Sequence, residues 1–298
     1  MTPADSARPR RSVLYVPGSN ARAIAKAAAL PVDAVILDLE DSVLPAAKPA
    51  ARAAVLSAVR ARHFGYREVV VRANSLSSEW GLADLKAVAG SGVDGILLTK
   101  IDDAEAVHET IRVLEQSEAP VGLRLWCMAE TPRGVLDIDA IARSCPRLAV
   151  IVMGTADLGK ALRIPEHPDR MALVPALARC VLAARAAGLD ILDGVYTHLT
   201  DTAGFRQECV QGKQLGFDGK TLIHPDQIDA SNEIFGISAS DAAAAVELIG
   251  TWESAAAGGA GVAVLAGRMV ERLHVEEARR QLALYRLIQD QALSAGQA

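Results

Sequence analysis

Short runs of β-branched and aliphatic residues recur along the chain, separated by longer alanine- and leucine-rich segments with helical periodicity. Eight runs are predicted to be strands: residues 12–16, 34–39, 68–73, 95–99, 123–128, 148–153, 191–197 and 221–223. Helices are predicted over residues 21–30, 46–62, 82–89, 104–115, 134–143, 169–187 and 202–215. Strands that are apolar along their whole length are typical of parallel sheets, whose two faces are both covered. Eight β–α repeats favour a (β/α)8 TIM barrel, and an open doubly wound sheet remains the alternative.

The pattern changes after Gln227. A last barrel helix is predicted over residues 228–235, followed by a helix over 238–254, an Ala/Gly-rich flexible linker over 255–261, a short hairpin over 262–270 and an amphipathic helix over 275–289. We therefore expect a barrel over residues 11–235 and a C-terminal helix–hairpin–helix extension over 236–298. The extension could act as a lid or reach a neighbouring subunit, or it could be a packed terminal helix without a catalytic part.

Polar and ionisable residues follow the predicted strands, whose interiors are Val, Ile and Leu. In chain order they are Pro17, Gly18, Ser19 and Asn20; Asp38, Glu40 and Asp41; Arg72 and Asn74; Lys100; Glu130; Asp157; Tyr196, His198 and Asp201; and His224. Active sites of TIM barrels lie where strands end and helices begin. The pattern therefore predicts a site at that end of the barrel.

Glu130 and Asp157 follow neighbouring strands, so they should meet at one rim of the sheet. Two adjacent carboxylates repel unless a cation lies between them, and oxygen ligands of this kind suit Mg²⁺. Arg72 offers a planar fork that can hold the carboxylate of a small oxoacid. At least one of the three acids after the second strand is expected to bind metal-bound waters. The alternative is that these acids are solvated loop residues.

Composition narrows the class of protein. The chain has 298 residues, of which 51% are hydrophobic and 22% charged, which is typical of a globular protein. Its net charge of -5 gives no support to a nucleic-acid partner. No run of about 18 apolar residues and no secretory signal are present, so we expect a cytoplasmic protein without a membrane span. The four cysteines form no C-x-x-C pair, so neither a zinc site nor a disulfide framework is indicated.

Several motifs resemble the CitE-like branch of the HpcH/HpaI aldolase superfamily, which includes citrate lyase β subunits, malyl-CoA and citramalyl-CoA lyases and related thioesterases. They are Arg11-Ser-Val-Leu-Tyr-Val-Pro-Gly18, Val35-Ile-Leu-Asp-Leu-Glu-Asp-Ser-Val43 with Lys48 and Ala51-Arg52, Val70-Val-Arg-Ala-Asn74, Ala129-Glu-Thr131, Gly154-Thr-Ala-Asp-Leu158, Gly216-Phe-Asp-Gly-Lys220 and Ile223-His-Pro-Asp-Gln227.

The resemblance implies a TIM barrel with Mg²⁺ at Glu130 and Asp157 and with Arg72 as the oxoacid anchor. It implies Claisen-type cleavage or formation of a short β-hydroxyacyl-CoA, such as malyl-CoA or citramalyl-CoA, with an oxoacid and an acyl-CoA as the two halves. It also implies a homotrimer or a dimer of trimers in which the C-terminal segment closes over a neighbouring active site. Further substrate-binding residues are expected in two groups. These are Arg11, Pro17, Gly18 and Lys26 near the CoA entrance, and Gly154 and Thr155 beside the metal.

The tail departs from the motif of malyl-CoA lyase-like members, Met-Ile/Val-Asp-x-Pro, whose Asp is the catalytic acid/base. Here the stretch is Met269-Val270-Glu271-Arg272-Leu273. Glu271 can still move protons, but its carboxylate lies one methylene further out. We expect Glu271, Arg72 and Asp41 to take part in catalysis.

Four functions remain open at this point. The first is a Mg²⁺-dependent carbon–carbon lyase acting on an acyl-CoA. The second is a thioesterase on a malyl-type CoA ester, or an aldolase on a free hydroxy acid. The third is a citrate lyase β subunit-like protein that acts on an acyl carrier partner. The fourth, a non-catalytic CoA-binding barrel, fits poorly with a retained metal pair and oxoacid anchor.

Overall fold

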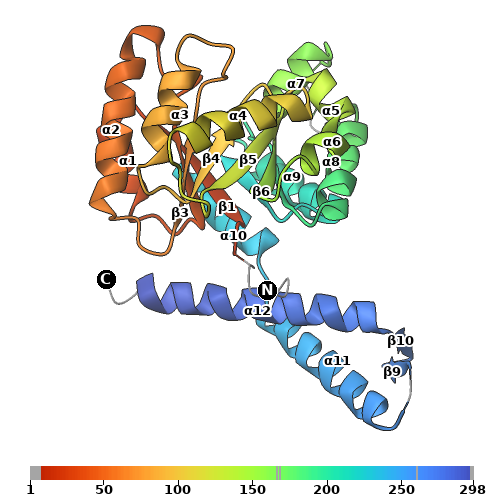
Figure 1. Cartoon of the computed structure of the whole chain (residues 1–298). Helices are drawn as coiled ribbons and strands as arrows, with labels where there is room; N and C mark the ends of the chain where they lie inside the picture. The colour runs from red at the N-terminus through yellow and green to blue at the C-terminus, as the bar shows by residue number, and fades with distance from the viewer. Residues whose placement is uncertain (1–7, 166, 168, 260, 296–298) are drawn as a thin grey trace. The chain divides into compact units, whose positions relative to one another are not determined.

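An eight-stranded parallel barrel forms the larger part of the protein (Figure 1). The computed structural model describes residues 8–165, 167, 169–259 and 261–295. The strands are β1 Ser12–Pro17, β2 Ala34–Asp38, β3 Glu68–Arg72, β4 Gly95–Leu98, β5 Arg124–Ala129, β6 Leu148–Met153, β7 Asp190–Asp193 and β8 Gly219–Leu222. Each strand pairs with the next in parallel, and β1 also pairs with β8. This closure confirms the predicted TIM barrel and excludes the open sheet.

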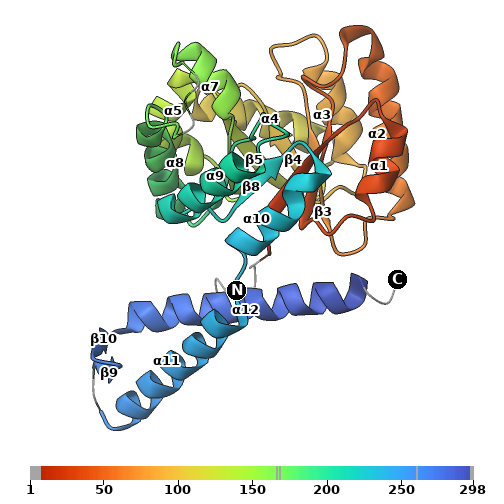
Figure 2. The same ribbon diagram turned by 180° about the vertical axis from the view of Figure 1, so that it is seen from behind.

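Helices surround the strands. They are α1 Ala21–Ala27, α2 Lys48–Ala61, α3 Gly81–Ala89, α4 Ala104–Gln116, α5 Pro132–Leu136, α6 Ile138–Ala142, α7 Thr155–Ala161, α8 Val174–Ala186, α9 Thr202–Leu215 and α10 Ile228–Phe235. Short 3-10 turns, η2 Pro45–Ala47 and η3 Pro225–Gln227, precede α2 and α10. Figure 2 shows α9 and α10 beside each other over β8, as their contacts require.

The helices differ from the predicted ones in several places. Helix α8 begins at Val174, five residues after the predicted start at 169. The predicted helix over 134–143 is two short helices, α5 and α6, that meet at Asp137. Helix α7 was not predicted at all, although it carries Asp157 in its first turn. It has only seven residues, too few for helical periodicity to be recognised in the sequence.

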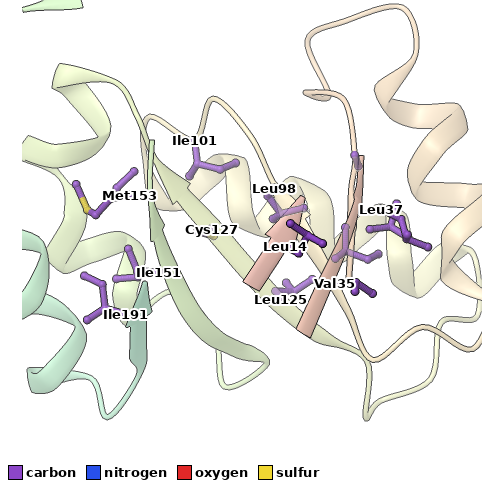
Figure 3. Packing of buried hydrophobic residues seen from close by; sticks show 14 of the residues in the cluster. Leu14, Val35, Leu37, Leu98, Ile101, Leu125, Cys127, Ile151, Met153 and Ile191 are labelled. Carbon is purple, nitrogen blue, oxygen red and sulfur yellow. The ribbon is translucent and has the colours of Figure 1, made fainter. Parts of the chain in front are cut away.

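Alternation along the strands produces two apolar layers. Ala34 and Ile36 of β2 join Trp126 and other side chains that fill the barrel interior. Val35 and Leu37 of the same strand point the other way, into the layer between the strands and the helices (Figure 3). Because successive side chains of a strand face opposite sides, one strand serves both layers. This double burial explains the uninterrupted apolar runs in the sequence.

Buried ion pairs close the amino-terminal end of the barrel. Arg10 donates to both carboxylate oxygens of Glu68, at 2.7 and 2.9 Å, and its guanidinium lies over the ring of Trp126. Arg11 forms a two-pronged pair with Asp33, at 2.7 and 2.9 Å. Residues at this face of a TIM barrel serve stability rather than catalysis.

The chain divides into two compact units. One is the barrel, Arg10–Phe235, and the other contains Gly236–Ala298 together with the start of the chain. In the second unit, helix α11 Ala239–Ala257 leads to an antiparallel hairpin of β9 Ala263–Leu265 and β10 Arg268–Val270, and then to helix α12 Arg272–Ala295. Ala263, Val270 and Val275 form a small apolar core there. The predicted linker over 255–261 is partly wrong, because α11 continues through Ala257; Ala260 lies outside the described residues.

One stretch, Pro225–Ala257, is long and apolar enough to cross a membrane by length and composition. The search of the sequence for about 18 consecutive apolar residues did not find this stretch, because Asp241 and Glu247 interrupt its alanine-rich part. A single helix that passes this test is weak evidence for a membrane. The expected absence of a membrane span therefore remains a prediction.

Candidate active site

A cleft of about 440 Å³ opens at the carboxyl ends of the barrel strands. Its lining residues are Tyr15, Pro17, Asp38, Asp41, Ser42, Arg72, Met128, Glu130, Met153, Gly154, Thr155, Ala156, Asp157, Val195, Thr221 and Ile223. The lining residues come from the second half of a barrel strand, from the loop that follows it or, for Thr155, Ala156 and Asp157, from the first turn of α7. Of the predicted rim residues, Pro17, Asp38, Asp41, Arg72, Glu130 and Asp157 line this cleft, whereas Ser19, Asn20, Tyr196, His198, Asp201 and His224 do not.

Glu130 and Asp157 converge on one point, which the ammonium of Lys100 marks. Lys100 Nζ lies 3.2 Å from Glu130 Oε2 and also contacts the Asp157 carboxylate. The backbone N–H of Lys100 donates to Glu130 Oε1 at 2.6 Å. Lys100 adopts a left-handed backbone conformation, with φ 53°, that is uncommon for a residue other than glycine. Two carboxylates that share one cationic group are spaced to share a metal ion as well.

The two carboxylates have different environments. Burial raises the pKa of Glu130 above its usual range, although hydrogen bonds from Lys100 oppose this. Asp157 is more exposed, and its slight burial, which alone would raise its pKa, is outweighed by the hydrogen bond and charge of Lys100, so its pKa is lowered. A cation at the point of convergence would keep both groups ionised.

Gly154 allows the backbone at the end of β6 to lie very close to the Glu130 side chain. A Cβ atom at position 154 would lie 2.3 Å from Glu130 Cβ and 3.2 Å from Glu130 Oε2. Only glycine therefore lets the end of β6 pass so close to the Glu130 side chain, with Asp157 presented from the first turn of α7.

Arg72 is surrounded by the acids that follow β2. Its Nε and Nη2 donate to the two oxygens of Asp38, each at 2.7 Å, and these residues are opposite each other in the β2–β3 ladder. Nη1 lies 3.0 Å from Glu40 Oε2 and 3.6 Å from Asp41 Oδ2. Asp38 occupies two of the five guanidinium N–H groups. Glu40 Oε2 is close to Nη1 but has no hydrogen-bond partner among the described residues, so the Nη1 hydrogens and one Nη2 hydrogen can still turn to an anion in the cleft.

Glu40 is the most perturbed of these acids. Burial raises its pKa to about 7; the charges of Asp41 and Glu130 act in the same direction, and Arg72 opposes them. Asp38, by contrast, has a lowered pKa, because the hydrogen bonds and charge of Arg72 outweigh its own burial. Neighbouring carboxyl groups with divergent pKa values are a feature of catalytic sites.

The donor set fits a magnesium ion. Five carboxylates (Asp38, Glu40, Asp41, Glu130 and Asp157) gather around two cations (Arg72 and Lys100). Among the described residues, no cluster of three or more His, Cys, Asp or Glu side chains is placed to hold a metal. Mg²⁺ is usually held by one or two carboxylates and keeps its other positions for water and substrate, so the Glu130–Asp157 pair suffices.

Of the other predicted site residues, some lie at or beside the cleft and others lie away from it. Pro17 and Thr155 line the cleft, and Gly18 lies beside it, where its N–H donates to the Asp38 carbonyl at 2.8 Å. Lys26 is exposed in the last turn of α1 and does not line the cleft. The expectation that Arg11 lies near the CoA entrance is wrong, because Arg11 precedes β1 and pairs with Asp33 at the opposite end of the barrel.

Glu271 lies in the second unit, directly after β10, where its backbone N–H donates to His274 Nδ1 at 3.0 Å. Its catalytic role therefore remains a prediction.

Sequence reasoning missed Tyr15 and gave Lys100 no role. The ring of Tyr15 lies 4.9 Å from the Arg72 guanidinium, and its buried hydroxyl has no hydrogen-bond partner among the described residues. In the sequence, Tyr15 is one residue of an apolar strand, and only its hydroxyl group distinguishes it from its apolar neighbours. Lys100 follows β4 as Glu130 follows β5, which was a usable signal.

Comparison with known proteins agrees with this geometry. A family model described as HpcH/HpaI aldolase/citrate lyase matches residues 11–225. The chain belongs to the HpcH/HpaI aldolase/citrate lyase family. It is 44% identical over 280 residues to a (3S)-malyl-CoA thioesterase of Cereibacter sphaeroides, covering 94% of this chain and 96% of that protein. It is 37% identical over 281 residues to citrate lyase subunit beta of Escherichia coli, covering 93% of each.

Solved structures of CitE and of a citrate lyase beta subunit resemble the chain over most of its length. The CitE protein of Mycobacterium tuberculosis, in complex with magnesium, acetoacetate and coenzyme A, superimposes with a TM-score of 0.74 at 28% identity, covering 94% of this chain and 98% of that chain. A second structure, citrate lyase beta subunit of the same organism with oxaloacetate and magnesium, gives a TM-score of 0.65 at 30% identity, covering 79% and 99%. The expected family is thereby confirmed, and with it an enzyme class of CoA-related lyases and thioesterases.

Proposed function

We propose that this protein is a Mg²⁺-dependent thioesterase that hydrolyses a short 3-hydroxyacyl-CoA of the malyl type. The observation that carries the proposal is the convergence of Glu130 and Asp157 on one point, in the same cleft as Arg72. The 44% identity to a (3S)-malyl-CoA thioesterase supports the hydrolytic outcome. So does the tail, in which Glu271 and Leu273 replace the Asp and Pro of the lyase motif.

In this proposal the acyl group binds through its free carboxylate and hydroxyl. The remaining Nη1 and Nη2 hydrogens of Arg72 hold the carboxylate, while Asp38 keeps the guanidinium plane fixed. Glu130 and Asp157 would hold Mg²⁺, which would act there as a Lewis acid on the oxygens of the substrate. The backbone N–H of Lys100 donates to Glu130 and holds that carboxylate at the site, while the Lys100 ammonium, which contacts both carboxylates, would give up its place to the ion.

Asp41 is the proposed general base. It lies at the cleft, its side chain is 63% exposed, and it is 3.6 Å from Arg72 Nη1. In this role its exposed carboxylate accepts a proton from the attacking water. The water oxygen then bonds to the thioester carbonyl carbon, the C–S bond breaks, and the products are the free hydroxy acid and CoA thiol.

The second candidate is the carbon–carbon lyase. The family name and the 37% identity to citrate lyase subunit beta favour it. In that reaction the bond between the hydroxyl-bearing carbon and the adjacent methylene breaks, and malyl-CoA yields glyoxylate and acetyl-CoA without free thiol. The arrangement of Arg72, Glu130 and Asp157 serves both reactions.

One assay separates the two. Purified protein with Mg²⁺ is given malyl-CoA, and thiol, malate and glyoxylate are followed together. Thiol with malate in equal amounts supports the thioesterase, whereas glyoxylate without thiol refutes it in favour of the lyase. Glu130→Gln and Asp157→Asn should remove both activities and Mg²⁺ binding measured by calorimetry. If either variant retained full activity, the metal site would be wrong.

Cytoplasmic location and assembly as a homotrimer or dimer of trimers are also proposals. In such an assembly the unit that contains Glu271 would act as a lid or reach a neighbouring active site. Size-exclusion chromatography with light scattering tests the assembly.

A further inference from the structure

A buried lysine lies behind the Arg72 side of the cleft. Lys48, the first residue of α2, is only 5% exposed. Its ammonium donates to the carbonyls of Leu39 and Glu40 at 2.9 and 2.8 Å, and to Asn74 Oδ1 at 2.7 Å. The three N–H groups of the ammonium thus have three acceptors, and the charge also lies 5.0 Å from the ring of Trp80.

The two carbonyl acceptors, those of Leu39 and Glu40, lie just beyond the end of strand β2. Strand β2 ends at Asp38, so the next carbonyls have no ladder partner in regular sheet geometry. Lys48 supplies donors to both, and Asn74 Nδ2 also donates to the Leu39 carbonyl at 2.8 Å. The Glu40 carbonyl also accepts from the backbone N–H of Val43 at 3.1 Å, so Lys48 is not its sole donor; what Lys48 adds is a direct link from both carbonyls to the Asn74 side chain.

The rest of the network fixes Asn74. Asp84 accepts from the backbone N–H of Asn74 at 3.0 Å and from its Nδ2 at 2.6 Å. Arg52 Nε in turn donates to Asp84 at 2.6 Å. Asn74 follows Arg72 by two residues. The network therefore joins the end of β3, which carries Arg72, to the loop that carries Glu40 and Asp41.

The three acids around Arg72 all come from this stretch. Asp38 is its first residue, Glu40 is one of the carbonyl acceptors of Lys48, and Asp41 follows at once. Ser42 Oγ donates to Asp38 at 2.5 Å and closes the loop. A shift of the loop would move all three carboxylates relative to the guanidinium. Lys48 itself does not line the cleft.

We propose that Lys48 is a positioning residue for carboxylate recognition: through the Leu39 and Glu40 carbonyls it sets how the acid loop surrounds Arg72. The assignment of Arg72 to the substrate carboxylate rests on the proposed function. The metal half of the site lies on β5, β6 and α7, outside this network. Lys48 should therefore control KM and leave Mg²⁺ affinity nearly unchanged.

The test is Lys48→Met, with Arg67→Met as the matched control. Arg67 is also a buried cation that donates to two main-chain carbonyls, Leu30 at 2.6 Å and Phe64 at 3.1 Å, and it also lies over an aromatic ring, that of Tyr66. It precedes β3 at the amino-terminal end of the barrel, away from the cleft. Both variants should lose thermal stability.

Only Lys48→Met should raise KM for malyl-CoA, by about tenfold or more, because a misplacement of roughly 1 Å can cost about 100-fold in rate. Hydrogen exchange should become faster over residues 39–43 in Lys48→Met and stay unchanged there in Arg67→Met. Mg²⁺ affinity should stay within about threefold of the unchanged protein in both, since neither cation touches Glu130 or Asp157. Lys48→Arg retains the positive charge and the N–H donors, so its KM should lie between that of the unchanged protein and that of Lys48→Met.

Unchanged KM and unchanged exchange over 39–43 in a folded Lys48→Met protein would overturn the proposal, as would an equal rise of KM in Arg67→Met. If Lys48→Met does not fold, Lys48→Arg decides by the same two measurements. If the unchanged protein does not act on malyl-CoA, the proposed function fails, and the exchange comparison still decides whether Lys48 holds the loop.

Discussion

Replacement of Gly154 by alanine should damage the metal site through one methyl group. The new Cβ would lie 2.3 Å from Glu130 Cβ and 3.3 Å from Glu130 Cα. Carbon atoms in contact are normally about 3.5–4.0 Å apart, so the end of β6 and the Glu130 side chain would have to separate by more than about 1 Å. The backbone of Gly154, at φ -93° and ψ 69°, has no left-handed strain, so the effect is steric.

A displacement of that size at the pair of metal carboxylates should lower kcat/KM by roughly 100-fold. It should weaken Mg²⁺ binding as well, because Glu130 and Asp157 would no longer converge. The assay is malyl-CoA turnover as a function of Mg²⁺ concentration, with calorimetric titration of Mg²⁺ as a second readout.

Gly159→Ala is the matched control. It makes the same change five residues later, inside α7, where nothing lies within 4 Å of the new methyl group. Alanine in a helix interior is favoured over glycine by about 0.5–1 kcal/mol, so this variant should be slightly more stable and equally active. A Gly154→Ala protein with unchanged Mg²⁺ affinity and turnover would refute the close packing at Glu130.

Three further predictions follow from the cleft. Arg72→Lys keeps the charge but loses the planar fork and its pairing with Asp38, so KM for malyl-CoA should rise at least about tenfold while Mg²⁺ affinity barely changes. The pKa of Glu40 is raised to about 7 in the folded protein, so the folded state binds this proton more tightly than the unfolded state does. The resulting contribution to the free energy of unfolding is present at low pH and is lost as the pH rises through about 7. Glu40→Gln should therefore flatten the fall in unfolding free energy between about pH 5 and about pH 8, measured by urea denaturation with chelator present; an equal fall in both proteins would count against this. Glu271→Ala should lower kcat more than Mg²⁺ affinity, and an unaltered kcat would remove the tail from the chemistry.

Much of the barrel could be predicted because its strands are buried on both faces, which leaves a strong apolar signature. The rim acids were predictable for the same reason: Glu130 and Asp38 stand at the ends of such runs. Lys100 was placed at the rim but given no role, and Tyr15 was not recognised at all, because the contacts of both side chains involve neighbours that are distant in sequence and that the closed sheet brings near. Arg11 was expected near the CoA entrance on the basis of the family resemblance. Its position directly before β1 instead indicates the amino-terminal end of the barrel, opposite the cleft. The position of Glu271 relative to the cleft does not follow from local pattern, since it depends on tertiary and quaternary packing.

The boundary between Phe235 and Gly236 has an evolutionary consequence. The metal carboxylates and the guanidinium are encoded entirely before it, and Glu271 with its neighbours entirely after it. Under the proposed roles of these residues, mutation or recombination in the second segment would change the processing of a bound thioester without disturbing Glu130, Asp157 or Arg72. Such a division would allow lyases and hydrolases to arise repeatedly from one ancestral barrel.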